Sequence, residues 1–430
     1  MSEMVLSAIE KSKSRTLKEK TMRCILAIQH LVAMFGATVL VPFLTGLDPS
    51  VALFSAGCGT LIFHLCTKGK VPVFLGSSFA FIPVIISVGK AYDGDLRYAQ
   101  GGMFVAGLIY VIVSLIIKKV GVGKIKAILP AQVVGPMIMV IGLNLLPTAL
   151  NMASKNWTLA IITLGVTLII KFFGKGFTKQ IAILCGVAVG YIVALFMGEV
   201  QTAEIASAAI FSIPSFTLPK FDMGAIVIIA PVVLAVFMEH IGDITTNGQV
   251  VGENFIEDPG LNRTLLGDGL ATIAASLVGG PANTTYGENT GVLAVTKNYD
   301  PSILRITAVF AIGLAFIAKF GAAIRTVPEA VMGGISIMLF SMIAIVGPKT
   351  IKSEKVKFSW NNIIVMVVIL FLGLGASYVK TQFDITLGIK ITEDVGITGL
   401  SFAALVGVTL NLVLNWIRNL LNLILNWIKK

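Results

Sequence analysis

Long apolar runs recur along nearly the whole chain and limit the class of fold that it can adopt. They lie between Cys24 and Ile417, with short polar breaks between them. Each measures about 17 to 25 residues, enough for a helix to cross ~30 Å of hydrocarbon. With 56% hydrophobic and 13% charged residues, this chain of 430 is far too apolar to fold in water. We expect an all-α polytopic membrane protein with about fourteen transmembrane segments.

The basic residues indicate topology. They are spread over short loops, whereas a nucleic-acid-binding protein gathers them in one patch, so we expect no nucleic-acid partner. With about fourteen spans and both termini in the cytoplasm, most of the 33 Lys and Arg residues face the cytoplasm. The polar segment 1–23 leads into the first apolar run without a cleavage site. The expected location is the cytoplasmic (inner) membrane, in contact with lipid.

The second half of the chain echoes the first. Gln29-His30 returns as Glu239-His240, and Asp48-Pro49 returns as Asp258-Pro259 at the same offset. Internal repeats of this kind are typical of secondary transporters. Because each copy holds an odd number of spans, the copies would have opposite orientations. We therefore expect a 7+7 inverted repeat.

Two stretches in matching places are expected to break their helices. Val71–Ser78 and Gly279–Gly287 are rich in Pro, Gly, Ser and Thr, and each precedes a helical stretch too short to span alone. Non-helical backbone at membrane depth is tolerated only where protein or a water-filled cavity satisfies its polar groups. The substrate should lie between Ser78/Phe79 and Gly287/Glu288, with two half-helix N-termini aimed at it.

Three carboxylates stand within apolar spans, where ionisable groups are costly and usually functional. Glu239 and Asp243 are four residues apart, on one helix face, and Glu288 follows the second break. Three crowded acids cannot all be ionised, so at least one should hold a proton near neutral pH. This predicts proton coupling through Glu239 and Asp243, with His30 beside the position equivalent to Glu239. Alternatively one acid, Asp243 above all, is paired structurally.

The sequence carries no motif that is typical of an enzyme. Glu239-His240 lacks the HExxH spacing of a zinc protease, and no phosphate-binding loop is present. The four cysteines are isolated in apolar segments. We expect a transporter with no catalytic residues, no metal and no cofactor.

Several segments resemble the nucleobase/ascorbate transporter family. Glu288–Lys297 reads ENTGVLAVTK and matches its signature, [QEP]-N-x-G-x-x-x-x-T-[RKG], at every defined position. GSSFAF at 76–81, EHIG at 239–242 and QHLVAMFGATVLVP at 29–42 resemble the bacterial uracil permease branch. The resemblance implies uracil:proton symport, in a homodimer. It also implies a core domain (1–120 and 221–320) and a gate domain (121–220 and 321–430).

The resemblance also implies roles at the site. Glu239 would accept the ring N–H groups and couple the proton, with Glu288 as second acid. The backbone amides of Phe79 and Gly287 would donate to the uracil carbonyls. The substrate-binding set implied in full is Glu239, Glu288, Phe79, Gly287, Ser78 and Tyr286.

Two alternatives stay open. Asp243 stands where the best-known uracil permease pattern has histidine, and resembles purine-transporting branches, so a xanthine or urate symporter is the runner-up. An anion transporter on the same 7+7 plan is disfavoured by three carboxylates. The last segment should be an amphipathic tail at the cytoplasmic interface, marked by one polar stripe: Asn411, Asn415, Asn419, Asn422 and Asn426.

Overall fold

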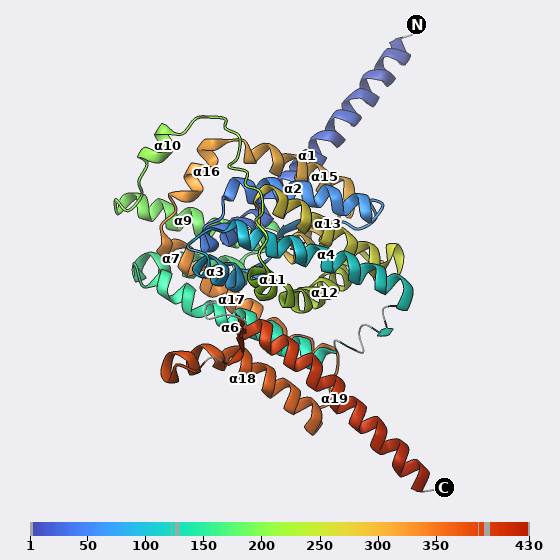
Figure 1. Ribbon diagram of the computed structural model, residues 1–430. Coiled ribbons are helices and arrows are strands. Elements are labelled where there is room, and N and C mark those ends of the chain that lie inside the picture. The colour runs from blue at the N-terminus through green and yellow to red at the C-terminus, as the bar shows by residue number, and fades with distance from the viewer. Residues whose placement is uncertain are drawn as a thin grey trace.

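The computed structural model describes residues 3–121, 123–124, 128, 130–385, 387–390 and 396–428. It is a bundle of helices with short strands (Figure 1). The first half comprises α1 (Glu3–Thr45), α2 (Pro49–Cys66), β1 (Leu75–Ser77), η1 (Phe79–Phe81), α3 (Ile82–Ala91), α4 (Arg97–Val120), α6 (Ala131–Ala153), α7 (Trp157–Phe173), α8 (Phe177–Gln180), α9 (Ala182–Phe196) and α10 (Ala203–Ser207).

The second half begins with α11 (Met223–Ile229), η2 (Ala230–Val232), α12 (Val233–Val251), η3 (Ile256–Gly260), α13 (Leu261–Val278), β2 (Asn283–Thr285) and α14 (Gly287–Thr296). It continues with α15 (Pro301–Ala315), α16 (Ala318–Arg325), α17 (Glu329–Ser353), α18 (Trp360–Phe383), β3 (Gly388–Lys390), β4 (Gly396–Thr398) and α19 (Gly399–Ile428).

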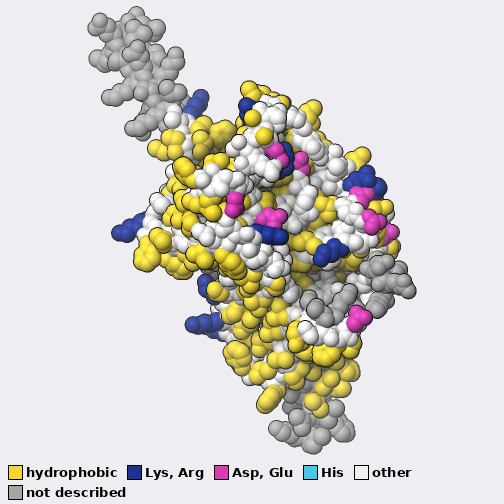
Figure 2. Space-filling view, turned by 90° about the vertical axis from the view of Figure 1, so that its left-hand side faces the viewer, with side chains coloured by type: hydrophobic (Ala, Val, Ile, Leu, Met, Phe, Trp, Pro, Cys, Tyr) yellow, Lys and Arg dark blue, Asp and Glu magenta, His cyan; other side chains and the backbone are white. Residues whose placement is uncertain are grey.

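The apolar runs form the expected helices. Among the described residues, seven helices are long and apolar enough to cross a membrane, and several shorter apolar helices accompany them. Large hydrophobic side chains remain exposed on the surface, as Figure 2 shows in yellow. The mostly helical, multi-span class predicted from the sequence is confirmed. The count of about fourteen spans stays a prediction.

Local sequence explains where two of the helices start. Asp48 precedes Pro49, and its carboxylate accepts a hydrogen bond from the Ser50 amide at 2.7 Å. Asp300 precedes Pro301 in the same way and accepts from the Ser302 amide at 2.9 Å. Proline suits the first helical position, and aspartate satisfies an amide that has no partner within the helix.

The packing of the helices repeats between the two halves. α2 packs against α15 as α13 packs against α4, and α1 contacts α15 as α11 contacts α4. α6 contacts α18 and α19, just as α17 contacts α7 and α9. The helices therefore form two groups, one around α2, α4, α13 and α15 and one around the α6–α17 pair. The sequence repeat thus has a counterpart in space.

Small residues let α6 and α17 approach closely. A Cβ on Gly142 would lie 2.5 Å from the Ala344 nitrogen and 2.6 Å from the Phe340 carbonyl oxygen. A Cβ on Gly333 would lie 2.4 Å from the Ala153 nitrogen. In membranes, backbone contact through small residues replaces the hydrophobic drive that holds helices together in water.

The two halves also meet at a short antiparallel ladder inside the bundle. β1 pairs with β2 in the register Leu75↔Thr285, Gly76↔Thr284 and Ser77↔Asn283, and all six residues are buried. Each strand is followed by a ten-residue helix, α3 or α14. Three residues from each of the two stretches predicted to break their helices are therefore extended and paired, while broken transmembrane helices stay a prediction.

The chain termini lie in long helices. α1 begins at Glu3, so the basic segment expected to precede the first span is helical, as suits its Lys, Arg and Glu residues. At the other end, the buried Asn411 of α19 accepts a 3.3 Å hydrogen bond from Gln132 of α6. The side chains of Asn419, Asn422 and Asn426 lie outside the described residues, so the polar stripe of the tail stays a prediction.

Candidate functional site

The strand ladder positions the starts of two short helices. The Ser78 amide donates to the Ala282 carbonyl at 2.9 Å, and the Tyr286 amide donates to the Phe74 carbonyl at 3.1 Å. Beyond these bonds the chain enters η1 at Phe79 and α14 at Gly287. Amides in a first helical turn have no partner within the helix, so both starts present donors that can bind an acceptor atom.

Each of the two starts has one buried and one accessible residue. Ser78 is fully buried, and its hydroxyl has no hydrogen-bond partner among the described residues. Phe79 is partly exposed and packs against two separate clusters of buried hydrophobic side chains, one that contains Phe81 and one that contains Phe74. Gly287 is exposed, and a Cβ built on it would meet one atom within 4 Å, the Asp243 Oδ1 at 3.9 Å. Open space therefore borders Gly287.

The three predicted acids meet at this space. Glu239 and Asp243 lie on α12, which packs against β2 and α14, and Glu288 lies in the first turn of α14. Asp243 Oδ2 accepts a hydrogen bond from the Thr285 hydroxyl at 3.2 Å. The carboxylates are close enough to interact electrostatically, and all three are partly accessible. A cluster of acceptors thus faces the two sets of amide donors.

Tyr286 has its phenol committed to the ladder. The side chain is 4% exposed, and its hydroxyl donates to the Ser77 carbonyl at 2.9 Å. A Cβ on Gly76 would lie 2.3 Å from the Tyr286 ring, so only glycine leaves room for the ring there. Tyr286 therefore ties β1 to β2.

His30 connects α1 with the helix that carries Glu288. It is buried, and its Nδ1 accepts a hydrogen bond from Asn289 Nδ2 at 3.1 Å. The same amide lies 3.2 Å from the His30 carbonyl oxygen. His30 thus holds the residue after Glu288.

A buried pair beside the site was missed from the sequence. His240 Nδ1 lies 2.8 Å from Asp268 Oδ2, and its Nε2 lies 2.9 Å from the Thr264 hydroxyl. Both members of the pair are almost fully buried, and Asp268 interacts electrostatically with Glu239. Asp268 lies between Gly267 and Gly269 in an apolar run. An acid inside such a run is the sequence signal that indicates it.

Metal ligation has little support here. Among the described residues, no group of three His, Cys, Asp or Glu side chains is placed to hold a metal ion.

A bundle of apolar helices, with acids and two helix starts around an interior space, defines a multi-pass membrane transporter. Residues 22–382 match the model of the Permease family. The chain is 42% identical to the uracil permease of Bacillus caldolyticus, over 90% of this chain and 91% of that one. It is 37% identical to the uracil permease of Escherichia coli, over 91% of each. The chain belongs to this permease family.

Family membership confirms the resemblance drawn from the sequence and shows a transporter, not an enzyme. Two solved structures share the fold. The transmembrane domain of a cyanobacterial bicarbonate transporter, BicA, has a TM-score of 0.60 and 16% identity, covering 81% of this chain and 94% of that one. The murine anion transporter Slc26a9, in the inward-facing state, has a TM-score of 0.66 and 10% identity, covering 92% and 68%.

Proposed function

We propose that this protein imports uracil by proton symport across the cytoplasmic membrane, with both termini in the cytoplasm. Two observations support this reading. The permeases with which it shares 42% identity are named for uracil. The polar, Lys/Arg-rich segment 1–23 before the first apolar run suits a cytoplasmic N-terminus.

The observation that carries the proposal is the meeting of acceptors and donors around one space. Uracil presents two ring N–H donors and two carbonyl acceptors. The carboxylates of Glu239 and Glu288 suit the N–H groups, and the amides at Phe79 and Gly287 suit the carbonyls. Ser78 and Tyr286 then hold the strands from which those amides project.

Proton coupling follows from the crowding of the acids. Glu239, Asp243 and Glu288 cannot all carry charge in one partly dry space, so a proton binds where substrate binds. Carrying an unneutralised carboxylate through the barrier is unfavourable, so movement requires the proton. His30 enters this pathway through Asn289, beside Glu288.

The two packing groups would move against each other. The core domain would comprise residues 1–120 and 221–320, and the gate domain residues 121–220 and 321–430. Rocking of one repeat-built group against another is a common form of alternating access. We extend the proposal to a homodimer, the state implied by the family resemblance.

Uptake into proteoliposomes tests the proposal. The wild-type protein should concentrate labelled uracil when a pH gradient is imposed and only equilibrate it otherwise. Glu239→Gln mimics the protonated acid, so it should abolish gradient-driven accumulation while leaving some uracil exchange. Accumulation by the variant at matched protein incorporation would move the coupling role to Asp243 or Glu288.

Purine transport is the second candidate because Asp243 stands at the position that differs from the best-known uracil pattern. Competition against labelled uracil by xanthine and urate separates the two readings. We expect unlabelled uracil to compete and the purines to compete weakly. Stronger competition by xanthine than by uracil would reverse the assignment.

A further inference from the structure

One face of α12 stays polar and exposed beyond the acids. Gly242 lies three and four residues before Thr245 and Thr246, and Gln249 lies four and three residues after them, so the four form one stripe. All four are exposed, although they lie in a segment apolar enough to span a membrane. The stripe starts beside Asp243, next to the space that borders Gly287.

Lipid does not suit this face. The hydroxyls of Thr245 and Thr246 bond back to the Ile241 and Gly242 carbonyls at 2.7 and 2.9 Å, so threonine alone does not decide the question. Gln249 decides it, because its amide makes no hydrogen bond to any described residue. An amide that faces hydrocarbon without a hydrogen-bond partner is strongly unfavourable. Water next to the stripe removes that cost.

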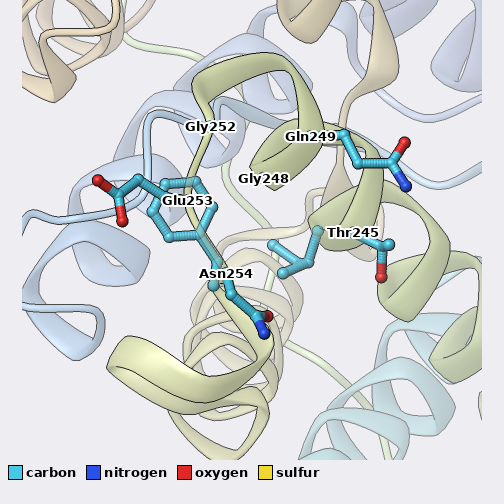
Figure 3. A pocket seen from close by; sticks show the side chains of 8 residues that line it. Thr245, Gly248, Gln249, Gly252, Glu253 and Asn254 are labelled. Carbon is cyan, nitrogen blue, oxygen red and sulfur yellow. The ribbon is translucent and has the colours of Figure 1, made fainter.

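A cavity opens where the stripe ends (Figure 3). It has a volume of about 420 Å³ and is lined by Thr245 and Gln249 of α12 together with Glu253, Asn254 and Phe255 of the following turn. Pockets for small molecules measure roughly 300 to 1,000 Å³. The two amides supply donors and acceptors, and the carboxylate supplies a further acceptor. This lining suits a small polar heterocycle in transit.

Nearby charges place the cavity on the cytoplasmic side. Lys70 pairs with Asp258, just past the cavity, and Arg263 donates to the Cys66 carbonyl at 3.2 Å. Basic loop residues favour the cytoplasmic side. The opposite end of this membrane span begins at Met223, directly after an acidic residue, Asp222.

We propose that the polar stripe of α12 lines the route between the acids and the cytoplasm, and that the cavity is its inner vestibule. The identity of the passenger as uracil rests on the proposed function. The route itself rests on the exposed Gln249 and the cavity.

Thiol labelling tests the route. In a background with Cys24, Cys58, Cys66 and Cys185 changed to serine, Thr246→Cys and Gln249→Cys are treated in inside-out vesicles with a charged, membrane-impermeant thiol reagent. Ile161→Cys on α7 is the matched control, because Ile161 is 62% exposed but apolar. The α12 variants should react about tenfold faster or more, since the reagent needs water. Reaction of both at the control rate would overturn the route.

Protection by added substrate tests which molecule occupies the route. Saturating uracil should slow the labelling of Thr246→Cys, whereas equal concentrations of a sugar should not. Fast labelling without protection, in a protein that still takes up uracil, would overturn the vestibule. Fast labelling of the α12 variants, together with a wild-type protein that takes up no uracil, would overturn the substrate assignment and support the route.

Discussion

Single carboxylates in this protein differ by their partners. Asp268 faces His240 in a buried pair, whereas Glu239, Asp243 and Glu288 share a partly accessible space. A buried ion or acid with a dedicated partner maintains structure, while acids that share one space with few partners are available to ligand and proton. Acidic residues therefore serve two purposes in neighbouring parts of this protein.

Glu288→Gln should weaken uracil binding while leaving the fold intact, because the change removes a charged acceptor at nearly constant volume. Charge-assisted hydrogen bonds contribute about 1.5 to 3 kcal/mol, so affinity should fall roughly tenfold or more. Calorimetry on the purified variant measures the loss. An unchanged dissociation constant would remove Glu288 from the binding site.

Asp268→Asn should destabilise the protein, because it removes the carboxylate that is hydrogen-bonded to His240 inside the bundle. Leaving a buried hydrogen-bonding group without its partner costs about 1–3 kcal/mol. The melting temperature in detergent should fall well below that of Asp243→Asn, which has no histidine partner among the described residues. Equal melting temperatures of the two variants would show that the pair contributes no special stability.

The pH profile of uptake should not depend on the exposed acids. Bonding to Arg97 and Lys220 holds the pKa of Asp95 well below its usual range. A lowered folded-state pKa gives stability that is present above the unfolded pKa and is lost as pH falls through the folded one. Asp95 therefore stays ionised across about pH 5 to 8, and Asp95→Asn should leave the profile unchanged. Asp243→Asn and Asp243→His should both shift it, because each changes the number of acids that share the space with Glu239. A shift in the Asp95 variant alone would contradict this assignment.

At the scale of elements, two helix contacts are close because glycine has no side chain. α6 and α17 meet backbone to backbone at Gly142, and α8 meets α14 at Gly291. The first contact joins the two segments of the proposed gate, and the second joins the proposed gate to the proposed core. A methyl group added at Gly142 should change stability, whereas one added at Gly291 should change uptake.

Gly142→Ala should lower stability, because its Cβ would meet backbone atoms that cannot turn aside. Overpacking costs about 1–3 kcal/mol, more than the roughly 1 kcal/mol that alanine adds to a helix over glycine. Gly165→Ala on α7 is the control, because nothing lies within 4 Å of its Cβ. The control should melt at or above the wild-type temperature. A Gly142→Ala variant that does the same would refute close packing.

Gln180 and Gly291 should act as a coupled pair. The Gln180 amide lies over Gly291, with its Oε1 2.4 Å from the position of an added Cβ, one turn beyond Glu288. Gln180→Ala removes the amide and Gly291→Ala displaces it, so each should slow uptake and the double variant should be no slower than either. A double variant whose uptake falls by the product of the two single-variant losses would show that the residues act independently.

At the scale of the whole molecule, each of the two packing groups contains helices from both halves of the chain. We expect transport to depend on motion of one group against the other. Contacts such as α8 with α14 and α12 with α6 join the groups, while the larger contacts lie within each group. An interface of this kind can separate without unfolding either side.

Crosslinking tests the motion. Gln180→Cys paired with Gly291→Cys, in the cysteine-free background, should retain the slowed uptake of the single variants when reduced. Oxidation should arrest this remaining uptake, and reduction should restore it. The control pair Gly107→Cys and Ile273→Cys joins α4 to α13 within one group, where a Cβ on Gly107 lies 2.7 Å from Ile273. Its oxidation should leave uptake unchanged. Uptake that survives the first crosslink would refute motion between the groups.

The sequence alone determined the class of protein, the repeat and three acids. Apolar run length reports bilayer thickness, and an acid in such a run is conspicuous because hydrocarbon penalises it. The signature at Glu288–Lys297 added the family. These are local or compositional properties, legible without coordinates.

Tertiary structure decided the partners. Asn289 reaches His30 across 259 positions of sequence, and the phenol of Tyr286 finds the Ser77 carbonyl across 209. Asp268 became significant only when folding brought it to His240. A hydrogen bond depends on distance and direction in space, which spacing along an unfolded chain does not carry. The helices were therefore predictable from local pattern, whereas the pairing of side chains between them required the fold.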